Sequence, residues 1–133
     1  DTKFGFGGFL RVSHAPPEKW TEKQRKLVQE LESWIGTPYK WGGNDRAGVD
    51  CSGLVVQAFK KLGISLPRTS AEMKVTKIGK VIRDELQVGD VLALPGHVAV
   101  HVGGGETIEA VDGGVGRSTI WRRSQVVVRR FLP

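Results

Sequence analysis

The sequence predicts an α+β domain in which N-terminal helices pack on one face of an antiparallel sheet of about five to six strands. Apolar residues recur with helical spacing over residues 21–35 and again over residues 52–62. From residue 80 onward they alternate with polar residues, the period of two that is typical of strands. Helices followed by consecutive strands favour the α+β class over an alternating α/β fold.

The bulk properties indicate one domain. A chain of 133 residues supports a single core. Its composition is ordinary for a globular protein, and it contains no apolar run long enough to cross a membrane. The net charge of +6 predicts attraction to polyanions. The basic residues do not form one tract with interleaved aromatics, and no nucleic-acid motif appears, so we expect no nucleic-acid partner.

Residues 1–17 are rich in Gly and Phe and end in two prolines. We expect them to form an arm or linker, followed by the folded domain over residues 18–133. A linker would be solvated, whereas an arm would pack its phenylalanines on the domain and edge a groove. The three phenylalanines, Phe4, Phe6 and Phe9, make the segment too apolar for a freely solvated linker, which favours packing. No signal peptide is visible and the chain begins at Asp1, so we expect a processed or trimmed product.

The first predicted helix spans residues 21–35. Thr21 and Gln24 fit a capping box at its start, and Gly36 and Pro38 end it. Its apolar stripe consists of Leu27, Val28, Leu31, Trp34 and Ile35. The next segment, residues 39–49, is predicted to be a loop.

Cys51 stands at the start of the second predicted helix, over residues 52–62, which stops at Gly63. It is the only cysteine, so it forms no internal disulfide. Unpaired backbone N–H groups and the positive end of the helix dipole favour the thiolate there, and the thiolate is the nucleophile. A lone cysteine is more often a small buried hydrophobe. Polar neighbours on both sides and the position at a helix start favour a reactive thiol instead.

A short helical turn is predicted near residues 71–74, and the rest of the chain reads as a meander of short strands. The predicted strands span residues 80–82, 91–94, 97–102, 107–111, 117–121 and 126–131. Alternation places His97, Ala99 and His101 on one face of the third strand. His97 lies just after a turn, where a side chain can reach over the sheet edge.

Four motifs follow one another along the chain. They are Gly36-Thr37-Pro38-Tyr39-Lys40-Trp41-Gly42-Gly43, Asp50-Cys51-Ser52-Gly53-Leu54-Val55, Gly89-Asp90-Val91 and His97-Val98-Ala99-Val100-His101-Val102-Gly103. These motifs resemble the NlpC/P60 family of papain-like cysteine peptidases of the bacterial cell wall. The resemblance covers about residues 34–115 and combines several motifs in the expected order. It implies a papain-like domain with its nucleophile at a helix N-terminus. It also implies a bacterial thiol protease that is periplasmic, wall-associated or secreted.

The resemblance further implies a catalytic set. His97 matches the general base, and Tyr39 matches a tyrosine whose hydroxyl can bond the oxyanion or the substrate. A His, Asn or Gln usually follows on the next strand to orient the base, but this position holds Glu109. A carboxylate can accept the imidazole N–H and stabilise the imidazolium, and it lies within diagonal reach of His97. His101 is the alternative, but it points parallel to His97, so we favour Glu109.

The substrate that the resemblance implies is the stem peptide of peptidoglycan, typically its bond between D-glutamate and a diamino acid. Asp50 and Ser52 flank the nucleophile and could bind a free amine of the stem, although Asp50 could equally cap the helix. Arg68 could bind a substrate carboxylate or lie on the solvated surface. Trp41 and His101 are further candidates for substrate binding. An anionic cell-wall polymer is a second possible partner, and we expect a monomer without a cofactor.

Three alternatives stay open. Cys51, His97, His101 and Glu109 could bind zinc, but no close-spaced ligand pair marks such a site. The Cys-His pair could serve a thiol amidase or acyltransferase that acts on a different amide. The chain could also be a non-catalytic wall-binding module, an alternative that the departure at Glu109 keeps open.

Overall fold

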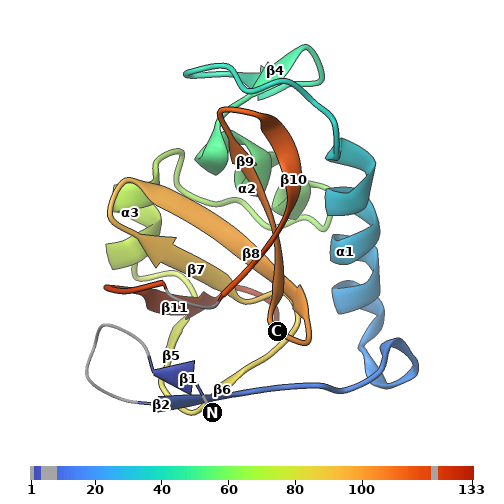
Figure 1. Ribbon diagram of the computed structural model, residues 1–133, viewed down its shortest axis with the longest axis vertical. Coiled ribbons are helices and arrows are strands. Elements are labelled where there is room, and N and C mark those ends of the chain that lie inside the picture. Colours follow the sequence, from blue (N-terminus) through green and yellow to red (C-terminus); the bar gives the residue numbers. More distant parts are fainter. Residues whose placement is uncertain (1, 4–8, 121–122) are drawn as a thin grey trace.

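The computed structural model describes residues 2–3, 9–120 and 123–133, and for Thr2, Lys3 and Phe9 only the backbone (Figure 1). It confirms the α+β class. The described residues form three α-helices, namely α1 (Glu22–Trp34), α2 (Cys51–Lys60) and α3 (Ser70–Val75), and a short 3-10 helix at Pro17–Lys19. The main sheet is antiparallel throughout. Its six strands lie in the order β10 (Gly114–Thr119), β9 (Glu106–Val111), β8 (His97–Gly103), β7 (Val91–Leu94), β11 (Val127–Arg130) and β5 (Lys80–Ile82).

The strand order corrects the predicted meander. β7 to β10 follow one another as predicted, but β11 lies between β7 and β5 at the other side of the sheet. Two arginines anchor it there. Arg130 donates to both carboxylate oxygens of Asp90, each at 2.8 Å, and Arg129 donates to the carbonyl oxygens of Thr76 and Ile78, each at 2.6 Å. Contacts between arginines of the last strand and distant segments therefore hold that strand in place, and local alternation carries no signal of these contacts.

The helices and the sheet enclose the main core. α1 begins with the predicted capping box, in which Thr21 and Gln24 bond each other's backbone N–H groups. The buried stripe of α1 matches the prediction except at Ile35, which caps the C-terminus of the helix and is exposed. Helix α2 adds Leu54, Val55, Ala58 and Phe59, and β8 contributes Val98, Val100 and Val102. Burial of these side chains holds α2, and with it Cys51, against the sheet.

The opposite face of the sheet carries a second apolar cluster, which the N-terminal arm completes. β2 (Phe9–Val12) pairs with β1 (Thr2–Lys3) and, in parallel, with β6 (Glu85–Leu86). Leu10 is fully buried in a cluster with Ile82, Leu86, Leu92, Ile120, Val126 and Val128. The described part of the arm thus packs on the domain, at the end of the molecule opposite β4 (Gly48–Val49). Phe4, Phe6 and the side chain of Phe9 lie outside the described residues, and the division at residues 17 and 18 stays a prediction.

The segment predicted as a loop, residues 39–49, contains a two-stranded ribbon of β3 (Asn44–Asp45) and β4. It packs closely on the first turn of α2. A Cβ on Gly53 would lie 2.3 Å from the carbonyl oxygen of Gly43, so only glycine permits this approach. The contact brings the loop that carries Tyr39 and Trp41 beside the start of α2.

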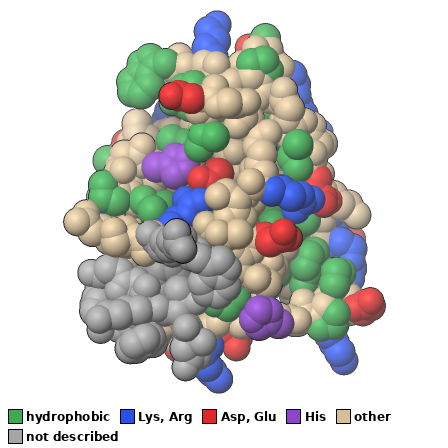
Figure 2. Space-filling view, in the orientation of Figure 1, with side chains coloured by type: hydrophobic (Ala, Val, Ile, Leu, Met, Phe, Trp, Pro, Cys, Tyr) green, Lys and Arg blue, Asp and Glu red, His purple; other side chains and the backbone are tan. Residues whose placement is uncertain are grey.

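The face that Figure 2 shows carries charged side chains of both signs. Acidic and basic side chains alternate on the face that Figure 2 shows, and no large area of it has a single sign. Over the ranges that the structure describes, we find no helix that combines the length and the apolar character needed to span a membrane.

Candidate active site

Cys51 is the first residue of α2, and its side chain is partly exposed. Burial raises the pKa of its thiol, but a hydrogen bond with His97, one from the backbone N–H of Val98 and the charge of His97 outweigh burial, so the pKa is lowered overall. The helix start adds unpaired backbone N–H groups and the dipole. This environment stabilises a thiolate.

His97 begins β8 and links the thiol to a carboxylate. Its Nε2 lies 2.9 Å from Oε1 of Glu109, which leaves Nδ1 to face Cys51. The hydrogen bonds with Cys51 and Glu109 raise the pKa of His97 to about 9, although burial opposes the rise. The site therefore favours a thiolate–imidazolium pair.

Glu109 is placed by the register of β8 and β9. Val100 pairs with Ile108, so Glu109 lies diagonal to His97, as predicted. Only 6% of Glu109 is exposed. Burial raises its pKa, but hydrogen bonds with His97, Arg123 and Thr107 lower it to about 2. The carboxylate is therefore charged beside the imidazole.

Two partners of Glu109 were missed by sequence reasoning. The hydroxyl of Thr107 donates to Oε2 at 2.5 Å, and Arg123 Nη2 donates to the same oxygen at 2.6 Å. Thr107 lies two residues before Glu109 on one strand, so alternation could have found it. Arg123 comes from the segment after β10, and no local pattern points to it. Together they fix the carboxylate on the side away from His97.

The prediction that His101 contacts the substrate is wrong. This side chain is 0% exposed. Its Nδ1 lies 3.0 Å from the carbonyl oxygen of Gln87, and the backbone N–H of Gly105 donates to its Nε2 at 3.0 Å. Burial lowers the pKa of His101, which matches a neutral ring that donates through Nδ1 and accepts through Nε2. Both nitrogens are used by the backbone, because the glycine-rich turn at residues 103–105 folds back onto the ring. Neither nitrogen is therefore free to orient His97.

Two hollows meet at Cys51. Both are lined by Tyr39, Cys51 and Gly96; one continues to His97 and Asp112, and the other continues to Trp41, Ser52 and Arg68. Together these two hollows form a groove that can hold an extended chain on both sides of the Cys51 sulfur.

The pKa of Tyr39 is raised, first by burial and then by the negative charges of Cys51, Asp50 and Asp112. Its hydroxyl therefore keeps its proton and can donate a hydrogen bond.

Trp41 stands at the edge of the second hollow. It is 87% exposed, although a large aromatic side chain is usually covered. Its ring is therefore available to whatever occupies this part of the groove.

Asp50, Ser52 and Arg68 contact one another beside Cys51. Asp50 caps α2 by accepting from the N–H of Gly53 at 2.6 Å, which is the alternative role considered from the sequence. Arg68 donates to Asp50 and Ser52, so it does not lie free in solvent. All three side chains are thus engaged with each other in this structure.

The four side chains considered as zinc ligands do not converge, because His101 is held by the backbone. Among the residues described, no group of three or more His, Cys, Asp or Glu side chains is placed to hold a metal ion.

The chain is similar to known wall hydrolases. The NlpC/P60 family profile matches residues 36–130. The murein DD-endopeptidase MepH of Escherichia coli is 37% identical over 137 residues, with 91% of this chain and 51% of that protein covered. The bifunctional muramidase/DL-endopeptidase CwlT of Bacillus subtilis is 37% identical over 110 residues, with 72% and 33% covered. The chain thus spans about half or less of these relatives.

A solved structure also resembles the fold. RipD of Mycobacterium tuberculosis, described as a non-catalytic NlpC/P60 domain protein adapted to peptidoglycan binding, superposes with a TM-score of 0.71 at 26% identity. The match covers 85% of this chain and 100% of that one. The same fold thus occurs both in proteins named endopeptidases and in one described as non-catalytic.

Proposed function

Because this chain belongs to the NlpC/P60 family, we propose that it is a cysteine endopeptidase that cleaves an amide bond in the stem peptide of peptidoglycan. One observation carries the proposal. A thiol at a helix start faces the imidazole of His97, whose far nitrogen lies 2.9 Å from the buried carboxylate of Glu109. Nucleophile, base and orienting group are the three parts that thiol-dependent acyl transfer requires.

The proposed reaction begins with attack of the Cys51 thiolate on the scissile carbonyl carbon. The carbonyl π electrons move to oxygen, and the backbone N–H of Cys51 and the hydroxyl of Tyr39 stabilise the resulting oxyanion. The intermediate collapses with cleavage of the C–N bond, and the imidazolium of His97 protonates the leaving amine. A water molecule, deprotonated by His97, then attacks the thioester carbon, and the C–S bond breaks to release the acid, which restores the thiolate and the imidazolium. Glu109 keeps the ring oriented and stabilises its charged form.

The proposal also specifies which bond of the stem peptide is cleaved. We place cleavage between D-glutamate and the diamino acid of the stem. The DL-endopeptidase activity in the name of CwlT supports this bond, and the DD-endopeptidase activity in the name of MepH supports a second one, a cross-link between stems.

We further propose that the protein acts as a monomer at the cell wall, in the periplasm or as a secreted enzyme. Its net charge of +6 favours approach to an anionic wall polymer.

Hydrolysis of purified muropeptides tests the reaction and the bond together. Uncross-linked and cross-linked muropeptides are incubated with wild-type protein and with Cys51→Ala, and the products are identified by mass. We expect cleavage by wild type within the uncross-linked stem and none by Cys51→Ala, which removes one sulfur at a partly exposed site. Cleavage of cross-linked dimers alone would assign the DD bond instead.

The same experiment separates catalysis from binding. A non-catalytic wall-binding module is the second candidate, because RipD is described in those terms. It would bind sacculi in a sedimentation assay and leave every muropeptide intact. Cleavage that survives Cys51→Ala, or that a chelator abolishes in the wild type, would contradict the thiol mechanism.

A further inference from the structure

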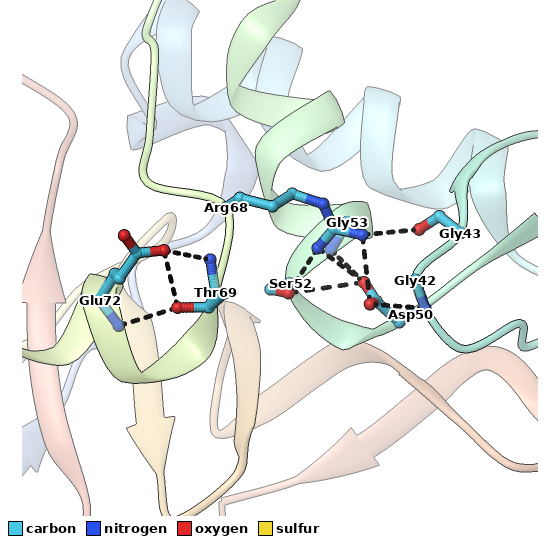
Figure 3. Close-up of polar contacts among 8 residues, drawn as sticks. All are labelled: Gly42, Gly43, Asp50, Ser52, Gly53, Arg68, Thr69 and Glu72. Atoms are coloured by element: carbon cyan, nitrogen blue, oxygen red, sulfur yellow. Dashed lines mark hydrogen bonds and ion pairs between the residues drawn. The ribbon is translucent and has the colours of Figure 1, made fainter.

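A second polar network lies directly beside the nucleophile, around Asp50 (Figure 3). Both carboxylate oxygens of Asp50 accept backbone N–H groups. Oδ1 accepts from Gly53 at 2.6 Å, and Oδ2 accepts from Gly42 at 3.1 Å. Asp50 is only 8% exposed, so its charge is largely removed from water. It thus joins the start of α2 to the loop at residues 39–49.

Arg68 closes this network from a third segment. Its Nη1 donates to Oδ1 of Asp50 at 3.0 Å and to the hydroxyl of Ser52 at 2.8 Å. Its Nη2 donates to Oδ2 of Asp50 at 3.2 Å and to the carbonyl oxygen of Gly43 at 3.2 Å. The guanidinium therefore forms a two-pronged ion pair with the carboxylate, a geometry that lysine cannot reproduce.

The backbone around Arg68 is itself fixed. Thr69 follows it immediately and caps α3 in a reciprocal box with Glu72: Oγ1 of Thr69 accepts the N–H of Glu72, and a carboxylate oxygen of Glu72 accepts the N–H of Thr69, each at 3.2 Å (Figure 3). A capping box restrains the chain at the helix start. The side chain of Arg68 thus leaves a restrained segment toward Asp50.

Asp50 creates an electrostatic problem for catalysis. It immediately precedes Cys51, and a negative charge near a thiol disfavours the thiolate. Asp50 raises the pKa of Cys51 and that of Tyr39, in each case after the effect of burial. The carboxylate is nevertheless needed where it lies, because it caps the helix that presents the thiol.

We propose that Arg68 is a positioning residue that neutralises Asp50, so that the helix cap does not suppress the Cys51 thiolate. Arg68 then acts through Asp50 and has no need to contact the substrate. The proposal rests on the proposed function only in taking Cys51 as the nucleophile. It concerns the free thiol, and it therefore applies to any scissile amide.

The other charged and titratable groups around the thiol stay constant in the test. Besides Asp50 and Arg68 they are His97 from β8, Glu109 from β9 behind His97, Tyr39 from the loop before β3, and Asp112 from the turn between β9 and β10. A shift of the alkylation midpoint in variants at residues 50 and 68 therefore reports on the charges of this pair.

The test is the pH dependence of alkylation of Cys51 by iodoacetamide, measured by mass in the absence of substrate. Arg68→Gln leaves Asp50 uncompensated, so we expect the midpoint to rise by on the order of half to one pH unit. Asp50→Asn keeps a good capping side chain and leaves Arg68 uncompensated, so the midpoint should fall. The double variant Asp50→Asn/Arg68→Gln removes both charges, and its midpoint should return close to the wild-type value.

Arg46→Gln is the matched control. Arg46 also pairs with a carboxylate, Glu30, at 3.2 Å and bonds a backbone carbonyl, but it lines a separate hollow with Trp34 and Lys60. Its loss changes the net charge equally and should not move the midpoint. Thermal unfolding checks that each variant is folded. If Arg68→Gln does not fold, the direction of the midpoint shift in Asp50→Asn still tests the proposal.

The outcomes are distinct from those of the proposed function. Opposite shifts in the two single variants support the proposal. An unchanged midpoint in Arg68→Gln, together with a raised KM for muropeptides, would make Arg68 a substrate contact and overturn it. Shifts in the same direction in both single variants would indicate general loosening of the helix start and overturn it as well. A wild-type midpoint near that of a free thiol would contradict the activated nucleophile, whatever Arg68 does.

Discussion

At the scale of single residues, the proposed chemistry depends on two side chains whose pKa values shift toward each other. Contacts with His97 and Val98 lower the pKa of Cys51 despite burial, and contacts with Cys51 and Glu109 raise the pKa of His97 to about 9. Each group stabilises the charged form of the other. The ion pair therefore exists in a window that opens above the lowered thiol pKa and closes near pH 9.

This window predicts the pH profile of the proposed hydrolysis. We expect kcat/KM to rise as Cys51 ionises, with a midpoint below the free-thiol value of about 8.5, and to fall above about pH 9 as His97 loses its proton. The fall has a chemical reason, since a neutral imidazole cannot protonate the leaving amine. The measurement is kcat/KM on one muropeptide at constant ionic strength. A profile that keeps rising beyond pH 9 would contradict the assignment of His97 as the proton donor.

Glu109 predicts a ranking of variants. Glu109→Gln keeps an oxygen that can accept the imidazole N–H but loses the charge that stabilises the imidazolium, so partial activity is expected. Glu109→Ala should cost more, by roughly tenfold to a hundredfold in kcat/KM, because neither geometry nor charge remains. The upper midpoint of the pH profile should fall in both variants, because Glu109 raises the pKa of His97. If neither variant changes activity or the midpoint, the active unit is a Cys-His dyad.

At the scale of elements, β8 carries two histidines with opposite properties. His97 begins the strand in the groove, and its pKa is raised. His101 lies four residues later, where burial lowers its pKa, and it bonds Gln87 and Gly105 through its two nitrogens. One strand thus carries a titrating imidazole at one end and a neutral structural ring farther along.

His101 predicts how stability depends on pH. Its folded pKa lies below the unfolded value of about 6.5, so the unfolded chain binds the proton more readily and the free energy of unfolding should fall as the pH drops below 6.5. His97 has the opposite sign, since its raised pKa adds stability that is lost toward pH 9. The difference between wild type and His101→Gln isolates the first effect.

Urea denaturation at pH 7.5 and pH 5.5 measures this difference. His101→Gln should lower stability at pH 7.5 by about 1–3 kcal/mol, because it disturbs two buried hydrogen bonds. The gap to wild type should narrow at pH 5.5. A gap that is the same at both pH values would contradict a neutral His101.

At the scale of the whole molecule, the sheet carries apolar side chains on both faces, and each face is covered by a different part of the chain. The helices cover one face, and the N-terminal arm completes the cluster on the other through Leu10. The arm lies at the opposite end of the molecule from β4 (Figure 1). We therefore expect the arm to contribute to stability and not to the chemistry.

Leu10→Ala tests this division. Deleting a fully buried leucine should lower the free energy of unfolding by about 2–5 kcal/mol. The alkylation rate of Cys51 in the folded state should not change. Val75→Ala, at a position that is 75% exposed, is the control and should cost less than about 0.5 kcal/mol. A loss of thiol reactivity in folded Leu10→Ala would show that the arm supports the groove.

Much of the fold was predictable from the sequence, because local patterns determine local structure. The period of apolar residues located α1, α2 and most of the strands, and capping residues marked where the helices begin. The motifs around Cys51 and His97 identified the family, and the strand register predicted that Glu109 lies diagonal to His97.

Tertiary structure decided what depends on residues that are far apart in the chain. It placed β11 between β7 and β5, buried His101 against the Gln87 and Gly105 backbone, and anchored Glu109 with Arg123. It also turned Arg68 toward Asp50, 18 positions earlier. The physical reason is common to all four. A hydrogen bond or ion pair forms wherever folding brings donor and acceptor within about 3 Å, and neither periodicity nor propensity encodes that distance.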